Sequence, residues 1–228
     1  MNADVNIAAT AALLADPTRA SFLLALLDGR ALTAGELARR ARVSPSTASA
    51  HLAKLADGGL ITLERSGRHH YVRLAGPAVA QALEAIASVA PPAPVRSLRE
   101  SETGAAIRAA RTCYDHLAGT LGVELTAAML GKGILVTTGD GYDVTPKGVR
   151  QLRELGLEVA RLKGLRRGFA LRCLDWSERR HHVAGALGAA IAEAFFERGW
   201  VKRTAASRAV VVTEAGRRGL AEFFDLRL

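Results

Sequence analysis

The two cysteines of this sequence each begin a Cys-x-Asp motif that is followed by a histidine. The six residues are Cys113, Asp115 and His116 in the first copy and Cys173, Asp175 and His182 in the second. Zinc and other borderline transition metals bind thiolate and imidazole donors, and carboxylates can complete the coordination or orient the imidazoles. The two copies together therefore predict a metal or effector site of four to six ligands.

The motifs belong to a longer internal repeat. Residues 116–135 align with 182–201 without a gap, and YDVTPKG at 142–148 matches VVVTEAG at 210–216. Each copy reads as helix, strand, turn, strand, helix, which is half of a winged-helix-like unit, so we expect two units packed as a pseudo-twofold pair. The copies span about residues 105–158 and 168–225. We expect each histidine to begin a helix, with Cys113 and His116 on one helical face.

Three effectors remain open for this repeat. One is a metal ion, such as zinc, and another is an oxidant that acts on the two cysteines. The third is a small apolar or aromatic ligand bound near Tyr114 and Trp176. Cysteine is also commonly a small buried hydrophobe, so simple packing is a fourth interpretation.

Enzymatic chemistry would use Cys113 as a nucleophile with a histidine as its base. We expect no catalytic residues, because the sequence contains no glycine-rich phosphate loop, nucleophile elbow or GxGxxG motif. A protein-interaction adaptor is a further alternative.

The first 90 residues show a different order of elements. Two helical patterns at 6–15 and 17–29 precede a short helix introduced by the capping box of Thr33 and Glu36. A helix then begins at Pro45 with Ser44 as its N-cap, and two alternating strands flank a Ser-Gly turn before a last helix at 77–89. The prolines of PPAPV at 91–95 predict a linker after it.

Three stretches carry a family resemblance: LADPTRASFLLALLDG, LTAGELARRARVSPSTASAHLAKLADGGLI and ERSGRHHYVRL. They resemble the DNA-binding domain of ArsR-type bacterial transcriptional regulators over about residues 5–90. The resemblance implies a homodimer, formed by the first helix and helix 77–89, on a palindromic double-stranded DNA operator. The thiolate motif that this family carries in its helix-turn-helix is missing, because TAGELARRARVS contains no cysteine.

The fold class we predict is mainly α with small β wings. A winged helix-turn-helix domain for DNA binding and dimerisation occupies residues 1–90, a linker covers 91–97, and the repeat domain covers 98–228. The predicted function is that of a transcriptional regulator, and more specifically a repressor released by an effector sensed in the repeat domain.

Small polar residues on the free face of helix 44–56 would contact DNA. Ala48, Leu52 and Leu55 recur at helical spacing and face the domain core, which leaves hydroxyl groups for the major groove. Ser44 also fits a helix cap, and His51 could contact phosphate or pack beside the preceding helix. The residues expected at DNA are Ser44, Ser46, Thr47, Ser49, Ala50, His51 and Lys54 on this helix, with Arg65 and Arg68 in the wing.

The net charge of +9 agrees with an anionic partner but locates no site. Residues 1–90 carry 9 basic and 7 acidic side chains (+2), and the remaining residues carry the other +7. No apolar run reaches the roughly 18 residues that a membrane span needs, and the N-terminus lacks the pattern of a signal peptide. We therefore expect a cytoplasmic protein with reduced thiols and no membrane partner.

Overall fold

The computed structural model describes residues 5–66, 69–91, 97–205 and 207–228. The chain divides into two compact units, Met1–Leu83 and Glu84–Leu228. The division lies within helix α5 (Pro77–Val89), earlier than the linker suggested by the prolines at 91–95. The second half of α5 is therefore part of the C-terminal unit.

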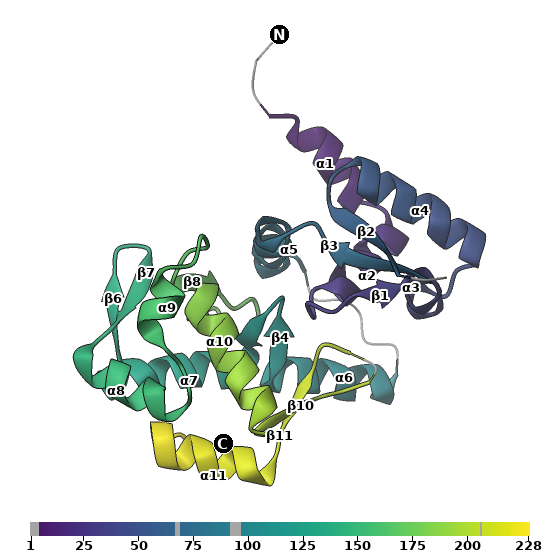
Figure 1. The fold of residues 1–228 in the computed structure, drawn as a ribbon. Helices are drawn as coiled ribbons and strands as arrows, with labels where there is room; N and C mark the ends of the chain where they lie inside the picture. Colours follow the sequence, from purple (N-terminus) through teal and green to yellow (C-terminus); the bar gives the residue numbers. More distant parts are fainter. Residues whose placement is uncertain (1–4, 67–68, 92–96, 206) are drawn as a thin grey trace. The chain divides into compact units, whose positions relative to one another are not determined.

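The N-terminal unit is a winged helix-turn-helix (Figure 1), as the sequence predicts. Its elements are α1 (Ile7–Leu14), α2 (Pro17–Leu26), β1 (Leu32–Thr33), α3 (Ala34–Ala41), α4 (Pro45–Asp57), β2 (Ile61–Ser66) and β3 (His69–Leu74). The strands form an antiparallel sheet in the order β1-β3-β2, of which β1 was not expected.

Local capping fixes the ends of these helices. The capping box forms as predicted, because the Thr33 hydroxyl accepts from the Glu36 N–H while the Glu36 carboxylate accepts from the Thr33 N–H. Ser44 caps α4 by accepting from the Thr47 N–H. The inner face of α4 buries Ala48, Leu52 and Leu55 within the core of the unit.

The C-terminal unit contains the two copies of the repeat. After α6 (Leu98–Ala109), the first copy comprises β4 (Arg111–Cys113), β5 (His116–Ala118), α7 (Gly119–Gly131), β6 (Leu135–Thr138), β7 (Gly141–Val144) and α8 (Pro146–Glu154). Helix α9 (Val159–Lys163) joins it to the second copy, which comprises β8 (Leu171–Leu174), β9 (His181–Ala184), α10 (Gly185–Glu197), β10 (Val201–Arg203), β11 (Val210–Val212) and α11 (Glu214–Phe224).

The two histidines do not begin helices, so that expectation is wrong. Cys113 pairs with His116 across the hairpin β4–β5, and Cys173 pairs with His182 across β8–β9. The first hairpin turns through only two residues, with Tyr114 in the left-handed region at φ 61°. The ligands of each copy therefore face each other across a β-hairpin instead of sharing a helical face.

The helix of each copy begins at the glycine of the HxAG motif. Gly119 and Gly185 have φ of 76° and 75°, a conformation that glycine adopts without steric cost. A side chain at either position would also collide with a backbone carbonyl, at 2.4 Å from Arg108 in the first copy and 2.6 Å from Gly168 in the second. These glycines turn the chain sharply from a buried strand into a buried helix.

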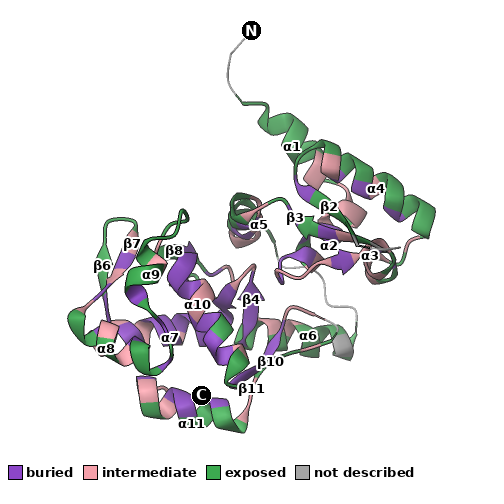
Figure 2. Cartoon of the chain, in the orientation of Figure 1, coloured by how far each residue is buried: buried purple, intermediate pink, exposed green. Residues whose placement is uncertain are grey.

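The copies exchange contacts in a reciprocal manner. Strand β5 packs against α10 of the other copy, and β9 packs against α7. Both helices are largely buried (Figure 2), and they contribute Leu121, Leu125, Leu187, Ile191 and Phe195 to one hydrophobic core. Within this frame the two ligand-bearing hairpins meet in the centre of the unit.

Candidate functional site

Four donor atoms from the two hairpins converge in the interior of the C-terminal unit. The ligand atoms of Cys113, His116, Cys173 and His182 all lie within 4.8 Å of one another. The two sulfur atoms are 3.9 Å apart, and the Nε2 atoms of the two histidines are 3.1 Å apart. All four side chains are buried, and both cysteines are free thiols.

These separations match the edges of a small tetrahedron. Zinc bonds of about 2.3 Å to sulfur and 2.05 Å to nitrogen imply edges of about 3.8 Å between two sulfurs and about 3.3 Å between two nitrogens. The distances of 3.9 and 3.1 Å lie within a few tenths of an ångström of both. The sulfur pair and the nitrogen pair thus already have the spacing of ligands to one ion, and the remaining separations among the four donors stay within 4.8 Å.

Each histidine faces the aspartate of its own copy through its other ring nitrogen. In the first copy, His116 Nδ1 lies 3.2 Å from Asp115 Oδ1, and the other carboxylate oxygen accepts from Arg167 at 2.6 Å. In the second copy, His182 Nδ1 lies 3.5 Å from Asp175 Oδ2. The aspartates are therefore not among the converging donors, and they stand where outer carboxylates orient metal-bound imidazoles.

Asp175 is the more heavily bonded of the two carboxylates. Its Oδ2 accepts from Arg111 at 2.9 Å and from the Gly119 N–H at 2.7 Å. Its Oδ1 accepts from the backbone and hydroxyl of Ser177 and from the Glu178 N–H. Burial acts to raise the pKa of Asp175, but the Arg111 charge and these hydrogen bonds hold it well below its ordinary value.

The environment sets opposite pKa shifts on the two histidines. Burial lowers the pKa of His116, but its interactions with Cys113 and with Asp115 outweigh burial and raise this pKa to about 9. Burial and the charge of His116 lower the pKa of His182 to about 3. The pKa of the Cys113 thiol is raised by its hydrogen bond with Cys173 and by burial.

Tyr114 and Trp176, the residues proposed for an organic ligand, occupy the turns of the two hairpins. The Arg111 guanidinium lies over the Trp176 ring, 4.7 Å from its centroid. One cavity of the C-terminal unit is lined by other residues, namely Lys147, Arg150, Gln151, Glu154, Glu222 and Phe223. Neither aromatic residue lines this cavity, and a ligand site between them stays a prediction.

Helix α4 presents the free face that the sequence predicts. Ser46, Thr47, Ser49, Ala50 and Lys54 are all exposed. The Ser44 hydroxyl lies within 2.9 Å of those of Ser46 and Thr47, and the Ser49 hydroxyl donates to the Pro45 carbonyl. The start of α4 therefore offers an exposed cluster of hydroxyl groups.

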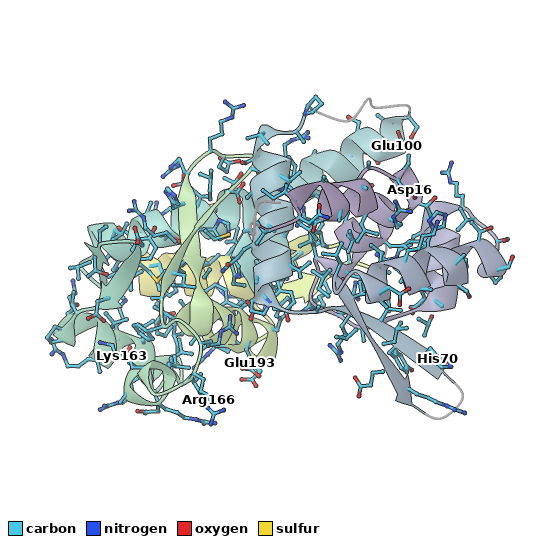
Figure 3. All side chains as sticks on the ribbon, turned by 90° about the horizontal axis from the view of Figure 1, so that it is seen from above. Asp16, His70, Glu100, Lys163, Arg166 and Glu193 are labelled. Carbon is cyan, nitrogen blue, oxygen red and sulfur yellow. The ribbon has the colours of Figure 1, made fainter. Side chains whose placement is uncertain are left out.

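The remaining predicted DNA residues differ in position. His51 packs within the N-terminal unit, 3.5 Å from Asp16 (labelled in Figure 3) and edge-on to Phe22. Of its two expected roles, packing is therefore the one that these contacts favour. Arg65 is exposed on β2, and His70 on the opposing strand β3 is labelled in Figure 3. Arg68 lies outside the described residues.

Two buried charged residues near the donor cluster were missed by sequence reasoning. Arg111 is fully buried, and Glu84 is 2% exposed. Glu84 accepts a hydrogen bond from Arg208 and lies 3.9 Å from the Arg111 guanidinium. Since arginine and glutamate usually lie at the surface, only the place of Arg111, two residues before a Cys-x-Asp motif, could have drawn attention to it.

The winged helix-turn-helix, with an exposed hydroxyl-rich face on α4, defines the class of this protein: a DNA-binding regulator of the helix-turn-helix type. A family model described as a helix-turn-helix domain matches residues 14–64. None of the helices in the described parts of the chain has the length and apolar character that crossing a bilayer requires.

The chain is 42% identical over 223 residues to YdfF, an HTH-type transcriptional regulator of Bacillus subtilis strain 168, and the match covers 98% of this chain and 99% of that protein. The chain belongs to this family of HTH-type transcriptional regulators. It is therefore a transcriptional regulator with a helix-turn-helix DNA-binding domain and a C-terminal extension.

Solved structures give shorter matches. The homodimeric winged helix-turn-helix domain Mb0332 of Mycobacterium bovis is 28% identical, covering 38% of this chain and 86% of that chain, with a TM-score of 0.33. The cadmium sensor CMTR of Mycobacterium tuberculosis is 34% identical, covering 41% of this chain and all of that chain, with a TM-score of 0.32.

Proposed function

We propose that this regulator is a homodimeric repressor whose C-terminal unit binds a divalent transition metal, such as zinc, and that the metal releases it from DNA. The observation that carries the proposal is the convergence of four donors within 4.8 Å. Cys113 and Cys173 supply two thiolates, and His116 and His182 supply two neutral imidazoles. Asp115 and Asp175 orient the imidazoles from the side of Nδ1, the ring nitrogen that does not face the metal.

Charge balance supports a divalent ion at this site. Two thiolates neutralise a 2+ charge, so the loaded cluster carries no net charge into the protein interior, where an unbalanced charge is costly. Sulfur and imidazole donors in a tetrahedral arrangement suit zinc, whereas magnesium and calcium prefer oxygen ligands. Neither aspartate needs to leave its present partners for the ion to bind.

An oxidant is the weaker candidate for the effector. A disulfide needs the sulfurs of Cys113 and Cys173 to approach from 3.9 Å to about 2.05 Å. The thiolate is the reactive form of cysteine, and the raised pKa of the buried Cys113 thiol keeps it protonated at neutral pH. Metal binding removes that proton by coordination, so it does not depend on an already reactive thiolate.

A zinc titration of the full chain tests the metal site. Competition with a chromophoric chelator should give one zinc per chain, and cobalt(II) should give the absorption of a tetrahedral thiolate complex. Cys113→Ser and Cys173→Ser should each weaken zinc binding by about 100-fold or more, because each removes a ligand. The control Thr112→Ser, next to Cys113 on β4, should bind zinc normally. Equal zinc affinity in all four proteins would refute the site.

Operator binding provides the functional readout. In the zinc-free protein, Cys113→Ser should bind DNA from its own promoter region as the wild type does. Zinc should weaken the DNA binding of the wild type and leave that of the variant unchanged. Zinc-bound protein that binds this DNA as tightly as zinc-free protein would refute the sensing role while leaving the metal site intact.

The proposed DNA surface is the free face of α4, with phosphate contacts from Lys54 and the wing. Lys54→Ala should weaken binding to all sequences and reduce the salt dependence by about one ion, whereas Thr47→Ala should change the preference between operators. Lys202→Ala, which removes an exposed cation of the C-terminal unit, is the control. Dimerisation through α1 and α5 is supported by Ile7, 73% exposed, and Ile86, 46% exposed.

A further inference from the structure

A line of buried charged groups leads away from the candidate metal site. His182 Nδ1 is 3.5 Å from Asp175 Oδ2, which accepts from the Arg111 guanidinium at 2.9 Å. The same guanidinium nitrogen is 3.9 Å from Glu84 Oε2, and the other oxygen of Glu84 accepts from Arg208. The Asp175 and Arg111 side chains are fully buried, and that of Glu84 is 2% exposed.

The hydrogen bonding of this line is incomplete at three points. His182 Nδ1, Arg111 Nε and Glu84 Oε2 are all buried without a hydrogen-bond partner. At the same time, Asp175 Oδ2 already serves two donors, Arg111 and the Gly119 N–H, with His182 next to it. A buried polar network with unsatisfied members is costly, and apolar residues of similar volume would often be at least as stable.

Such a network has room for a second arrangement. If the Nδ1–H of His182 bonds to Asp175 Oδ2, that oxygen takes a third donor and its bond to Arg111 weakens. Arg111 can then close the 3.9 Å gap to Glu84 Oε2, which has no hydrogen bond of its own. Discrete alternatives of this kind are the elements through which a ligand shifts a conformational equilibrium.

We propose that the Asp175–Arg111–Glu84 network transmits occupancy of the metal site to helix α5. This inference rests on the proposed function. Zinc on Nε2 of His182 would fix the position of the ring, place its proton on Nδ1 and strengthen the bond to Asp175. Glu84 lies on α5, which starts in the N-terminal unit and ends in the C-terminal one. Arg111 and Glu84 are thus positioning residues for regulation and not metal ligands.

Glu84→Gln tests this coupling, because it keeps the size of the side chain and removes its charge. The affinities of the full chain for zinc and for promoter DNA are measured, the latter with and without zinc. The wild type should show a zinc-dependent change in DNA affinity of about tenfold or more. Glu84→Gln should bind one zinc per chain as the wild type does, while its change in DNA affinity shrinks to within about twofold.

Linkage provides an independent readout of the same coupling. DNA must change zinc affinity by the factor by which zinc changes DNA affinity. Promoter DNA should therefore weaken zinc binding to the wild type and not to Glu84→Gln. The matched control is Glu178→Gln, which removes a carboxylate that accepts from Thr120 instead of Arg111 and should respond to zinc fully.

The outcomes separate this inference from the function on which it rests. A wild type without any zinc response contradicts the proposed function. A wild type that responds, together with a Glu84→Gln variant that responds equally, overturns only the network. If Glu84→Gln is unfolded, Glu84→Asp keeps the charge but withdraws it from Arg111, and a full zinc response in that variant also overturns the proposal.

Discussion

The two copies of the repeat supply the same cysteine, aspartate and histidine, but they place the aspartate in different surroundings. In the first copy, the side chain of Asp115 is 26% exposed and its partner Arg167 is 37% exposed. In the second, Asp175 and its partner Arg111 are both fully buried. The cysteine and histidine donors of the two copies are therefore equivalent, whereas the aspartate–arginine pairs next to the histidines are not.

A local difference in the chain explains this asymmetry. The first hairpin turns through two residues, so Asp115 lies in the turn itself and reaches solvent. The second hairpin has six more residues, at 176–181, and its loop donates to Asp175 from Ser177 and Glu178. Duplication accounts for the cysteine and histidine ligands in both copies. The longer loop of the second hairpin holds the Asp175 carboxylate in the protein interior.

Replacing the two aspartates is expected to give the largest difference between the copies. Asp175→Asn leaves the charge of Arg111 in the interior without its closest counter-ion, so we expect unfolding to become easier by about 3–5 kcal/mol. Asp115→Asn breaks an ion pair that solvent screens and should cost less than about 1 kcal/mol. Denaturant unfolding of the zinc-free proteins at pH 7 measures both values.

Asp143→Asn is a matched control for the exposed copy, since Asp143 pairs with Lys163 and both side chains are nearly half exposed. It should change stability as little as Asp115→Asn does. Equal and large losses for Asp115→Asn and Asp175→Asn would show that the surroundings of the two carboxylates are equivalent in solution. The asymmetry would then play no part in stability.

Substitutions in the packing between the two copies should, by contrast, lower stability by similar amounts in both copies. A β-carbon at Gly122 would lie 2.4 Å from the Leu117 carbonyl oxygen, and one at Gly188 would lie 2.5 Å from that of Val183. The backbone must shift to accept either, so Gly122→Ala and Gly188→Ala should each reduce the unfolding free energy by about 1–3 kcal/mol. The added β-carbons would also lie 3.6 and 3.2 Å from the Cβ of the histidine of the other copy.

Gly131→Ala provides the control, because Gly131 ends α7 and its added methyl would meet nothing within 4 Å. That change should leave stability unchanged or raise it by up to about 1 kcal/mol. A loss confined to one of the two buried glycines would mean that the reciprocal contacts of the copies are not energetically equivalent.

The sequence predicted the winged helix-turn-helix because its signals are local. The capping box of Thr33 and Glu36 and the buried spacing of Ala48, Leu52 and Leu55 on α4 are confirmed. The repeated Cys-x-Asp spacing also led to residues that come together. The error was to begin a helix at each histidine, where the chain forms a hairpin. In the first hairpin, a tyrosine in the left-handed conformation gives no turn signal of the kind that glycine or asparagine gives.

The charged network could not be predicted by the same means. Arg111 contacts Asp175 and Glu84, which are 64 residues after it and 27 residues before it in the chain. Neither periodicity nor local propensity relates such positions. Arginine and glutamate are also normally exposed, so their burial follows only from the tertiary packing of the two copies.

The pH dependence of stability in the zinc-free protein should distinguish the two histidines, which are expected to act in opposite directions. Because the pKa of His182 falls to about 3 on folding, the unfolded chain takes up a proton below about pH 6.5 that the folded chain refuses. Stability should therefore decrease as the pH falls, by about 1.4 kcal/mol per pH unit. The raised pKa of His116, about 9, stabilises the fold below pH 6.5, and this contribution is lost as the pH rises through 9.

Denaturant unfolding of chelator-treated protein between pH 5 and 9 separates the two contributions. His182→Asn should flatten the decrease on the acid side, and His116→Asn should flatten the decrease on the alkaline side. If His116→Asn instead removed the decrease on the acid side, His116 would be the histidine that resists protonation. His182, which lies next to Asp175, would then be the protonated one. The buried network would then face a charged imidazole before zinc arrives, and the two copies would have exchanged roles.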